Sequence, residues 1–135
     1  MLKLAYTTAV IAALSVPAIA DTMSNARMLR EMPADSMTVT DWYKQSVYDP
    51  SDKKIGEVMD VLLDKSGRVT SLIIGVGGFL GAGEKDVAVP FDAVHVTNKD
   101  NNKWYLVMNT TKDELKSAPG FKYDRSTTTW IADQK

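Results

Sequence analysis

Residues 54–76 read KIGEVMDVLLDKSGRVTSLIIGV, and this stretch decides the fold. In residues 54–64 the apolar side chains fall mainly at odd positions, which predicts a strand with one buried face and one partly solvent-exposed face. Residues 65–67 supply a hairpin loop in which glycine adopts a positive φ at little cost. Residues 69–76 form the most apolar strand of the chain, so we expect them at the centre of a sheet.

Further strands flank this hairpin on both sides. Residues 46–48 predict a short strand, and residues 103–109 predict a later one. Residues 86–97 predict a single strand that contains Pro90. Because proline cannot donate a ladder hydrogen bond, we expect Pro90 at a sheet edge or at a bulge.

These strands, joined by hairpins, predict an all-β fold. We expect a small antiparallel β-barrel of about five to six strands in which sequential neighbours pair. A short C-terminal helix over residues 112–117 should follow, capped by Thr110 or Thr111. The expected organisation is a flexible segment over 21–37 with room for a short helix at 25–32, a domain over 38–121, and a tail over 122–135 that can add an edge strand.

The N-terminus has the three parts of a secretory signal. Lys3 provides the positive charge, residues 4–16 are apolar, and residues 18–20 read Ala-Ile-Ala, a small-x-small cleavage site. The apolar run is shorter than the roughly 20 residues that span a membrane. We therefore expect cleavage after Ala20, a periplasmic or secreted protein, and no transmembrane segment in the mature chain.

Composition excludes several kinds of function. The chain has 16 basic and 17 acidic residues, a balance that argues against a nucleic-acid partner. It has no cysteine, which excludes thiol chemistry and thiolate metal sites. Its one histidine, His95, is expected on the same strand face as Phe91 and Ala93, as a structural residue rather than a base. We predict no catalytic residues, no cofactor and no metal.

The glycine-rich stretch after the central strand holds the candidate contact residues. Glu84 stands where a phosphate-binding loop needs its lysine, so a turn explains the glycines better. Phe79 and Leu80 lie at the loop tip, where they either fold over a barrel end as a lid or contact a partner. Glu84 and Lys85 form either a solvated turn or an ion-pairing rim beside them.

One pattern of residues extends through 41–120 in a fixed order. Its parts are residues 47–49, 54–58, 60–64, 67–69, 73–81, 84–92 and 111–115. This pattern resembles the PRC-barrel domain, the module named for the photosynthetic reaction-centre H subunit. The resemblance implies a small β-barrel that serves as an adaptor, and it supplies no catalytic residues.

Three functions remain open at this stage. The leading hypothesis is a non-catalytic cell-envelope adaptor that binds another envelope protein, or itself, through protein-protein contacts. The alternative is a carrier that holds a small apolar ligand at the barrel mouth beneath the glycine loop. A third hypothesis, a hydrolase, requires two carboxylates that converge in one pocket.

Overall fold

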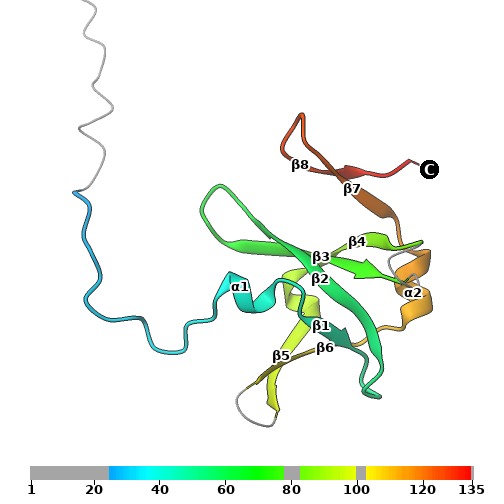
Figure 1. Cartoon of the computed structure of the whole chain (residues 1–135), viewed down its shortest axis with the longest axis horizontal. Coiled ribbons are helices and arrows are strands. Elements are labelled where there is room, and N and C mark those ends of the chain that lie inside the picture. The colour runs from blue at the N-terminus through cyan, green and yellow to red at the C-terminus, as the bar shows by residue number, and fades with distance from the viewer. Residues whose placement is uncertain (1–24, 78–82, 100–102, 135) are drawn as a thin grey trace, which may run out of the picture. The chain divides into compact units, whose positions relative to one another are not determined.

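The computed structural model describes residues 25–77, 83–99 and 103–134 (Figure 1). The chain separates into two units, residues 1–34 and 35–135. In the first unit, residues 25–34 are exposed and form neither helix nor strand, so the helix predicted at 25–32 is wrong. A helix this short depends on packing of its apolar face, and Met28, Leu29 and Met32 are all exposed.

The described residues of the second unit are built around one sheet of eight strands, more than the five to six expected, in the order β5-β6-β1-β2-β3-β4-β7-β8. The all-β prediction is confirmed. The elements are α1 (Val39–Trp42), β1 (Ser46–Tyr48), β2 (Lys54–Leu63), β3 (Val69–Val76), β4 (Lys85–Pro90), the 3-10 turn η3 (Phe91–Ala93), β5 (Val94–Lys99), β6 (Lys103–Met108), α2 (Lys112–Ser117), β7 (Gly120–Asp124) and β8 (Thr129–Ala132).

The strand predicted at residues 86–97 is in fact two strands, β4 and β5, separated by η3. Pro90 ends β4, and the chain then turns through Phe91, whose ring lies 5.2 Å from that of Trp42. On β4, β3 pairs with Pro90, whereas β7 pairs only with Asp86 and Val87. Pro90 therefore lies where β4 has a single neighbour, which confirms the expected edge position.

The sheet has to curl because of how β4 connects to β5. These two strands stand five strand spacings apart in the sheet order, which is about 24 Å in a flat sheet. The short η3 link between Pro90 and Val94 spans at most about 14 Å. The same curl brings β1 beside β6 in parallel, so the expected purely antiparallel meander is wrong. Within the described residues, β5 and β8 each have one strand partner, so the strand order is open.

Apolar side chains on the inner face of the curl form the core. Val58 and Ile74 lie opposite each other in the β2–β3 ladder and are completely buried. The odd positions of β2 were expected to be buried, and Ile55 is. Register shifts between Val58 and Asp60 and between Leu62 and Leu63 interrupt the alternation, so that Val58 is buried and Leu63 is 57% exposed. The other members of the core are Trp42, Val47, Ile55, Leu72, Val76, Val87, Val89, Val94, Leu106, Met108 and Leu115.

The C-terminal hairpin of β7 and β8 covers part of the outer face. Ile73 is fully buried but is not part of the main core, because it alternates with the inward-facing Leu72 and Ile74. Its ladder partner is Asp60, and the indole Nε1 of Trp130 donates a hydrogen bond of 2.7 Å to Asp60 Oδ2. This hydrogen bond therefore holds the hairpin against the outer face of the sheet, next to Ile73.

The predicted helix at residues 112–117 is confirmed as α2, with Thr111 as its cap. The Thr111 hydroxyl accepts from the Glu114 amide, and the Glu114 carboxylate accepts from the Thr111 amide. This reciprocal pair satisfies two amide groups that the start of a helix otherwise leaves unbonded. The cap fixes the position of Lys112, which belongs to the site described next.

Candidate functional site

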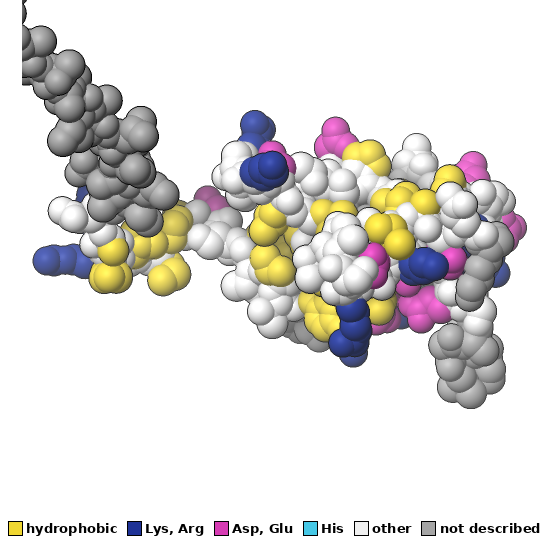
Figure 2. All heavy atoms as spheres, turned by 90° about the horizontal axis from the view of Figure 1, so that it is seen from above, with side chains coloured by type: hydrophobic (Ala, Val, Ile, Leu, Met, Phe, Trp, Pro, Cys, Tyr) yellow, Lys and Arg dark blue, Asp and Glu magenta, His cyan; other side chains and the backbone are white. Residues whose placement is uncertain are grey.

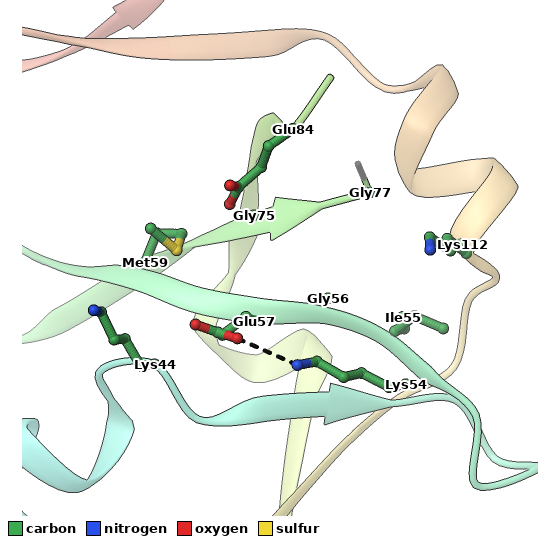
Figure 3. Close-up of a pocket in the computed structure, with 10 residues that line it drawn as sticks. All are labelled: Lys44, Lys54, Ile55, Gly56, Glu57, Met59, Gly75, Gly77, Glu84 and Lys112. Carbon is green, nitrogen blue, oxygen red and sulfur yellow. Dashed lines mark hydrogen bonds and ion pairs between the residues drawn. The ribbon is translucent and has the colours of Figure 1, made fainter. Parts of the chain in front are cut away.

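An open groove of ≈ 590 Å³ lies where β2 begins and β3 ends (Figure 3). This is the end of the sheet from which the glycine-rich loop leaves β3. The groove is formed by β2, by the end of β3, by the residue just before β4, by the first residue of α2 and by Lys44, two residues after α1. Its lining residues are Lys44, Lys54, Ile55, Gly56, Glu57, Met59, Gly75, Gly77, Glu84 and Lys112.

Glycines at the floor of the groove leave room for the side chains of neighbouring residues. A Cβ atom added to Gly75 would collide with the Glu84 carboxylate and would lie 2.9 Å from Met59 Cγ. Gly77 has a φ of 93°, a backbone conformation that favours glycine, and its added Cβ would lie 3.2 Å from Lys116 Cε. Gly75 itself is buried, because the side chains of Glu84 and Met59 lie over it.

Charged side chains of both signs surround this floor. Lys54 and Glu57 pair with each other at 3.2 Å, as the dashed line in Figure 3 marks. In the described part of the chain, no ion pair engages Lys44, Lys112 or Glu84. The groove thus presents two ammonium groups and one carboxylate that are free to bind groups of opposite charge.

The four predicted contact residues have different outcomes. Phe79 and Leu80 lie outside the described residues. Glu84 lines the groove and extends over Gly75 (Figure 3). Lys85 belongs instead to the neighbouring surface, where its Nζ donates a hydrogen bond of 2.7 Å to the Lys116 carbonyl. Glu84 and Lys85 both line a second hollow between β4 and β7, and among the described residues no ion pair joins them.

Beside this groove, a second hollow of ≈ 470 Å³ lies between β4 and β7. One carboxylate oxygen of Asp86 and one of Asp133 line it, buried and without a hydrogen-bond partner. Burial, followed by repulsion from Glu84, raises the pKa of Asp86 above its ordinary value. These carboxylates come from distant parts of the sequence, and no motif pointed to them.

A third cavity is small and apolar. It measures ≈ 100 Å³ and lies near the end of β2 and the start of β3, away from the glycine loop. The apolar-ligand alternative placed its ligand beneath that loop, where the described lining is largely charged. The residues of the small cavity are Met37, Val39, Trp42, Val61, Val69 and Phe91.

A polar cluster joins the β1–β2 turn to β5 and β6. The Tyr105 hydroxyl donates a hydrogen bond to Asp52 Oδ1, and Lys99 Nζ donates another at 3.1 Å. These bonds, that of Tyr105 first, hold the pKa of Asp52 below its ordinary value, and the bond to Asp52 raises the pKa of Tyr105. Tyr105 also stacks on Tyr48, with ring centroids 4.7 Å apart. Because the polar groups satisfy one another, we interpret this cluster as a structural tie.

His95 does not occupy the predicted environment. It is an exposed residue of β5, whereas Phe91 and Ala93 belong to η3, so the three do not share a strand face. Within the described residues, no group of three or more histidine, aspartate or glutamate side chains is arranged to hold a metal ion. Figure 2 shows acidic, basic and apolar side chains interspersed on the face in view.

The helices of the described segments are too short to cross a membrane. Comparison with known proteins adds one positive finding: the family model of the PRC-barrel domain matches residues 34–115, more than half of the chain. This match includes β1 to β6 and ends within α2, so β7 and β8 lie outside it. No curated protein shows significant sequence similarity to the chain.

Proposed function

Because the chain belongs to the PRC-barrel family, we propose that it is a non-catalytic adaptor of the cell envelope, which binds another protein through the groove at the start of β2 and the end of β3. The secretory signal expected over residues 1–20 supports an envelope location. The family is a generic small β-barrel module, which agrees with a binding role. In this proposal, Phe79 and Leu80 of the adjoining loop contact the partner beside Glu84.

The observation that carries this proposal is the glycine floor surrounded by unpaired charges. Because Gly75 has no side chain, the flexible side chains of Glu84 and Met59 lie over it and form the surface that a partner segment contacts. Lys44, Lys112 and Glu84 then fix its orientation, because charged groups across an interface select the partner more than they add affinity. A segment with acidic side chains toward the two lysines and a basic one toward Glu84 fits this arrangement.

The same features favour a protein over a small apolar ligand. Sites for small ligands are concave and predominantly apolar, with few polar groups. This groove is open to solvent and has five charged side chains in its lining. A protein segment uses such charges at a polar rim, where they remain partly hydrated.

Affinity capture with charge-reversed variants tests the proposal. Lys112→Glu and Lys44→Glu alter the groove, and Arg68→Glu is the matched control on the exposed β2–β3 loop at the other end of the strands. Each purified protein is immobilised and exposed to envelope extract, and the recovered proteins are quantified by mass spectrometry. We expect recovery of a defined partner to fall about 10-fold for each groove variant, equivalent to about 1.4 kcal/mol, and to stay unchanged for the control. Equal recovery with all three variants contradicts the proposal.

A further inference from the structure

The C-terminal hairpin of β7 and β8 is joined to the rest of the sheet by a short ladder. Among the described residues, β7 pairs with β4 at only two positions, one of which is Asp86 opposite Phe121, whereas β3 and β4 pair at six. The chain enters the hairpin from α2 through residues 118–119, and the hydrogen bond from Trp130 to Asp60 is a second attachment. Because few contacts hold it, the hairpin can leave β4 as a unit at a lower free-energy cost than unfolding of the core.

Asp86 lies at this joint with a carboxylate that the fold does not satisfy. One of its oxygens is buried, and no protein group donates a hydrogen bond to it. Its two cross-strand neighbours are Gly75, which has no side chain, and Phe121 of β7. Side chains of opposite residues lie next to each other on one face of a sheet, and Asp86 and Phe121 line the same hollow. When the hairpin leaves β4, Phe121 leaves with it and water reaches the carboxylate.

The charged groups around Asp86 do not neutralise it. Asp133, which follows β8, has a second buried oxygen without a hydrogen-bond partner in the same hollow. Lys85 directs its Nζ to the Lys116 carbonyl at the end of α2, and among the described residues no ion pair joins it to Asp86. The remaining charged side chains on the neighbouring elements are Glu84 before β4, the exposed Lys122 of β7, and Glu57 of β2, which pairs with Lys54.

From this joint we propose that the C-terminal hairpin is a pH-sensitive cover, which closes on β4 when Asp86 takes up a proton and opens more often when Asp86 is ionised. Attachment of the hairpin dehydrates the carboxylate, and a neutral carboxylic acid loses less hydration energy than an anion. Opening uncovers the outer face next to Ile73, a residue that is fully buried while the hairpin is attached. The cover therefore controls access to an apolar part of the sheet.

The direction of the pH dependence follows from the proton affinity of the two states. Burial, followed by repulsion from Glu84, raises the pKa of Asp86 in the closed state, so that state binds the proton more tightly than the open one. Attachment is therefore most stable below the ordinary pKa of 3.8, and it weakens as the pH rises from there through the raised pKa. Above the raised pKa the opening reaches a constant level.

Amide hydrogen exchange between pH 4 and pH 7, corrected for intrinsic exchange rates, tests the cover. A two-stranded hairpin is marginally stable alone, so amides of β7 and β8 exchange once it leaves β4. We expect them to open at least about 10-fold more often than amides of β3, and at least about 2-fold more often at pH 7 than at pH 4. Asp124 in the hairpin turn, whose pKa is lowered chiefly by the hydrogen bond from Ser126, loses its contribution only near and below 3.8.

Substitution of Asp86 identifies the group responsible. In Asp86→Asn the opening of β7 and β8 should be rarer than in the unmodified protein at pH 7, and it should no longer grow with pH. Asp86→Ala, which removes the charge without adding an amide, should also lose the pH dependence. Asp92→Asn, a control at an exposed carboxylate of η3, should keep it. Equal opening of the hairpin and β3, or a pH dependence that persists in both Asp86 variants, overturns the proposal.

Discussion

Gly56 and Gly75 lie on neighbouring strands but serve opposite sides of the sheet. A Cβ atom at Gly56 would lie 2.6 Å from Ile74 Cγ2 and 2.9 Å from the Gly75 carbonyl oxygen, both of which are buried within the sheet. A Cβ at Gly75 would meet the ends of two flexible side chains, Glu84 and Met59. The first glycine permits the close packing of the curl, and the second leaves room in the groove for the side chains of Glu84 and Met59. The same residue type thus has a structural role on one side and a proposed binding role on the other.

The largest expected change in the free energy of unfolding comes from Gly56→Ala, and Gly75→Ala is its matched comparison. Gly56→Ala should lower the free energy of unfolding by about 1–3 kcal/mol, because neither Ile74 nor the β3 backbone can move away without disturbing the core. Gly75→Ala should change it by less than about 1 kcal/mol, since Glu84 and Met59 can rotate and alanine suits a strand better than glycine. Urea denaturation of both variants checks this difference. Equal destabilisation would remove the distinction between the two sides.

An intermediate loss of stability is expected where Trp130 of the C-terminal hairpin donates a hydrogen bond to the outer face of the sheet. Trp130→Phe keeps an aromatic ring against the sheet but removes the indole donor to Asp60. We expect a loss of about 1 kcal/mol in the free energy of unfolding, because Asp60 Oδ2 loses a partner in a partly buried position. Amide exchange should also accelerate in β7 and β8 before it does in β3. Unchanged exchange in the hairpin would contradict this role of Trp130.

The smallest change in the free energy of unfolding is expected for a substitution at Asp86, and its size depends on pH. Its raised pKa means that the folded state binds the proton more tightly, so the ionised form opposes folding. Asp86→Asn should therefore stabilise the protein at pH 7, by less than about 1 kcal/mol because the side chain is partly solvated. The gain should diminish as the pH falls through the raised pKa and disappear below the ordinary value of 3.8. Thermal unfolding from pH 3 to 8 measures this, and a gain that grows toward acid pH would contradict it.

Local sequence signals predicted the elements that are fixed by nearby residues. The hairpin of β2 and β3 follows from alternation and from Gly67, whose φ is 84°. The start of α2 follows from Thr111 and Glu114, three residues apart. Features that depend on contacts between residues far apart in the sequence could not be predicted in this way. The register shifts after Val58 and Leu62 interrupt the alternation of β2, and the parallel pairing of β1 with β6 results from the curl of the whole sheet.

The candidate site was predicted only in part for the same reason. Glu84 was found because it adjoins an obvious glycine cluster. Lys44 lies just after α1 and Lys112 begins α2, and only the folded sheet brings them to one groove. Gly56 and Gly75, each within a strand, were the available signal, since a glycine in a strand interior often marks a close approach. The unpartnered oxygens of Asp86 and Asp133 have no counterpart in any sequence pattern.

Photo-crosslinking in living cells tests the central claim most directly, namely that recognition takes place at the glycine-loop end of the sheet. A photoreactive residue is placed at Phe79 in the glycine-rich loop or at Lys112 in the groove, and at Arg68 in the loop at the other end of β2 and β3 as the control. We predict one defined envelope protein crosslinked from Phe79 and from Lys112, and its absence from the Arg68 control. Crosslinks of equal yield from all three positions, or none from Phe79 and Lys112, would contradict the account.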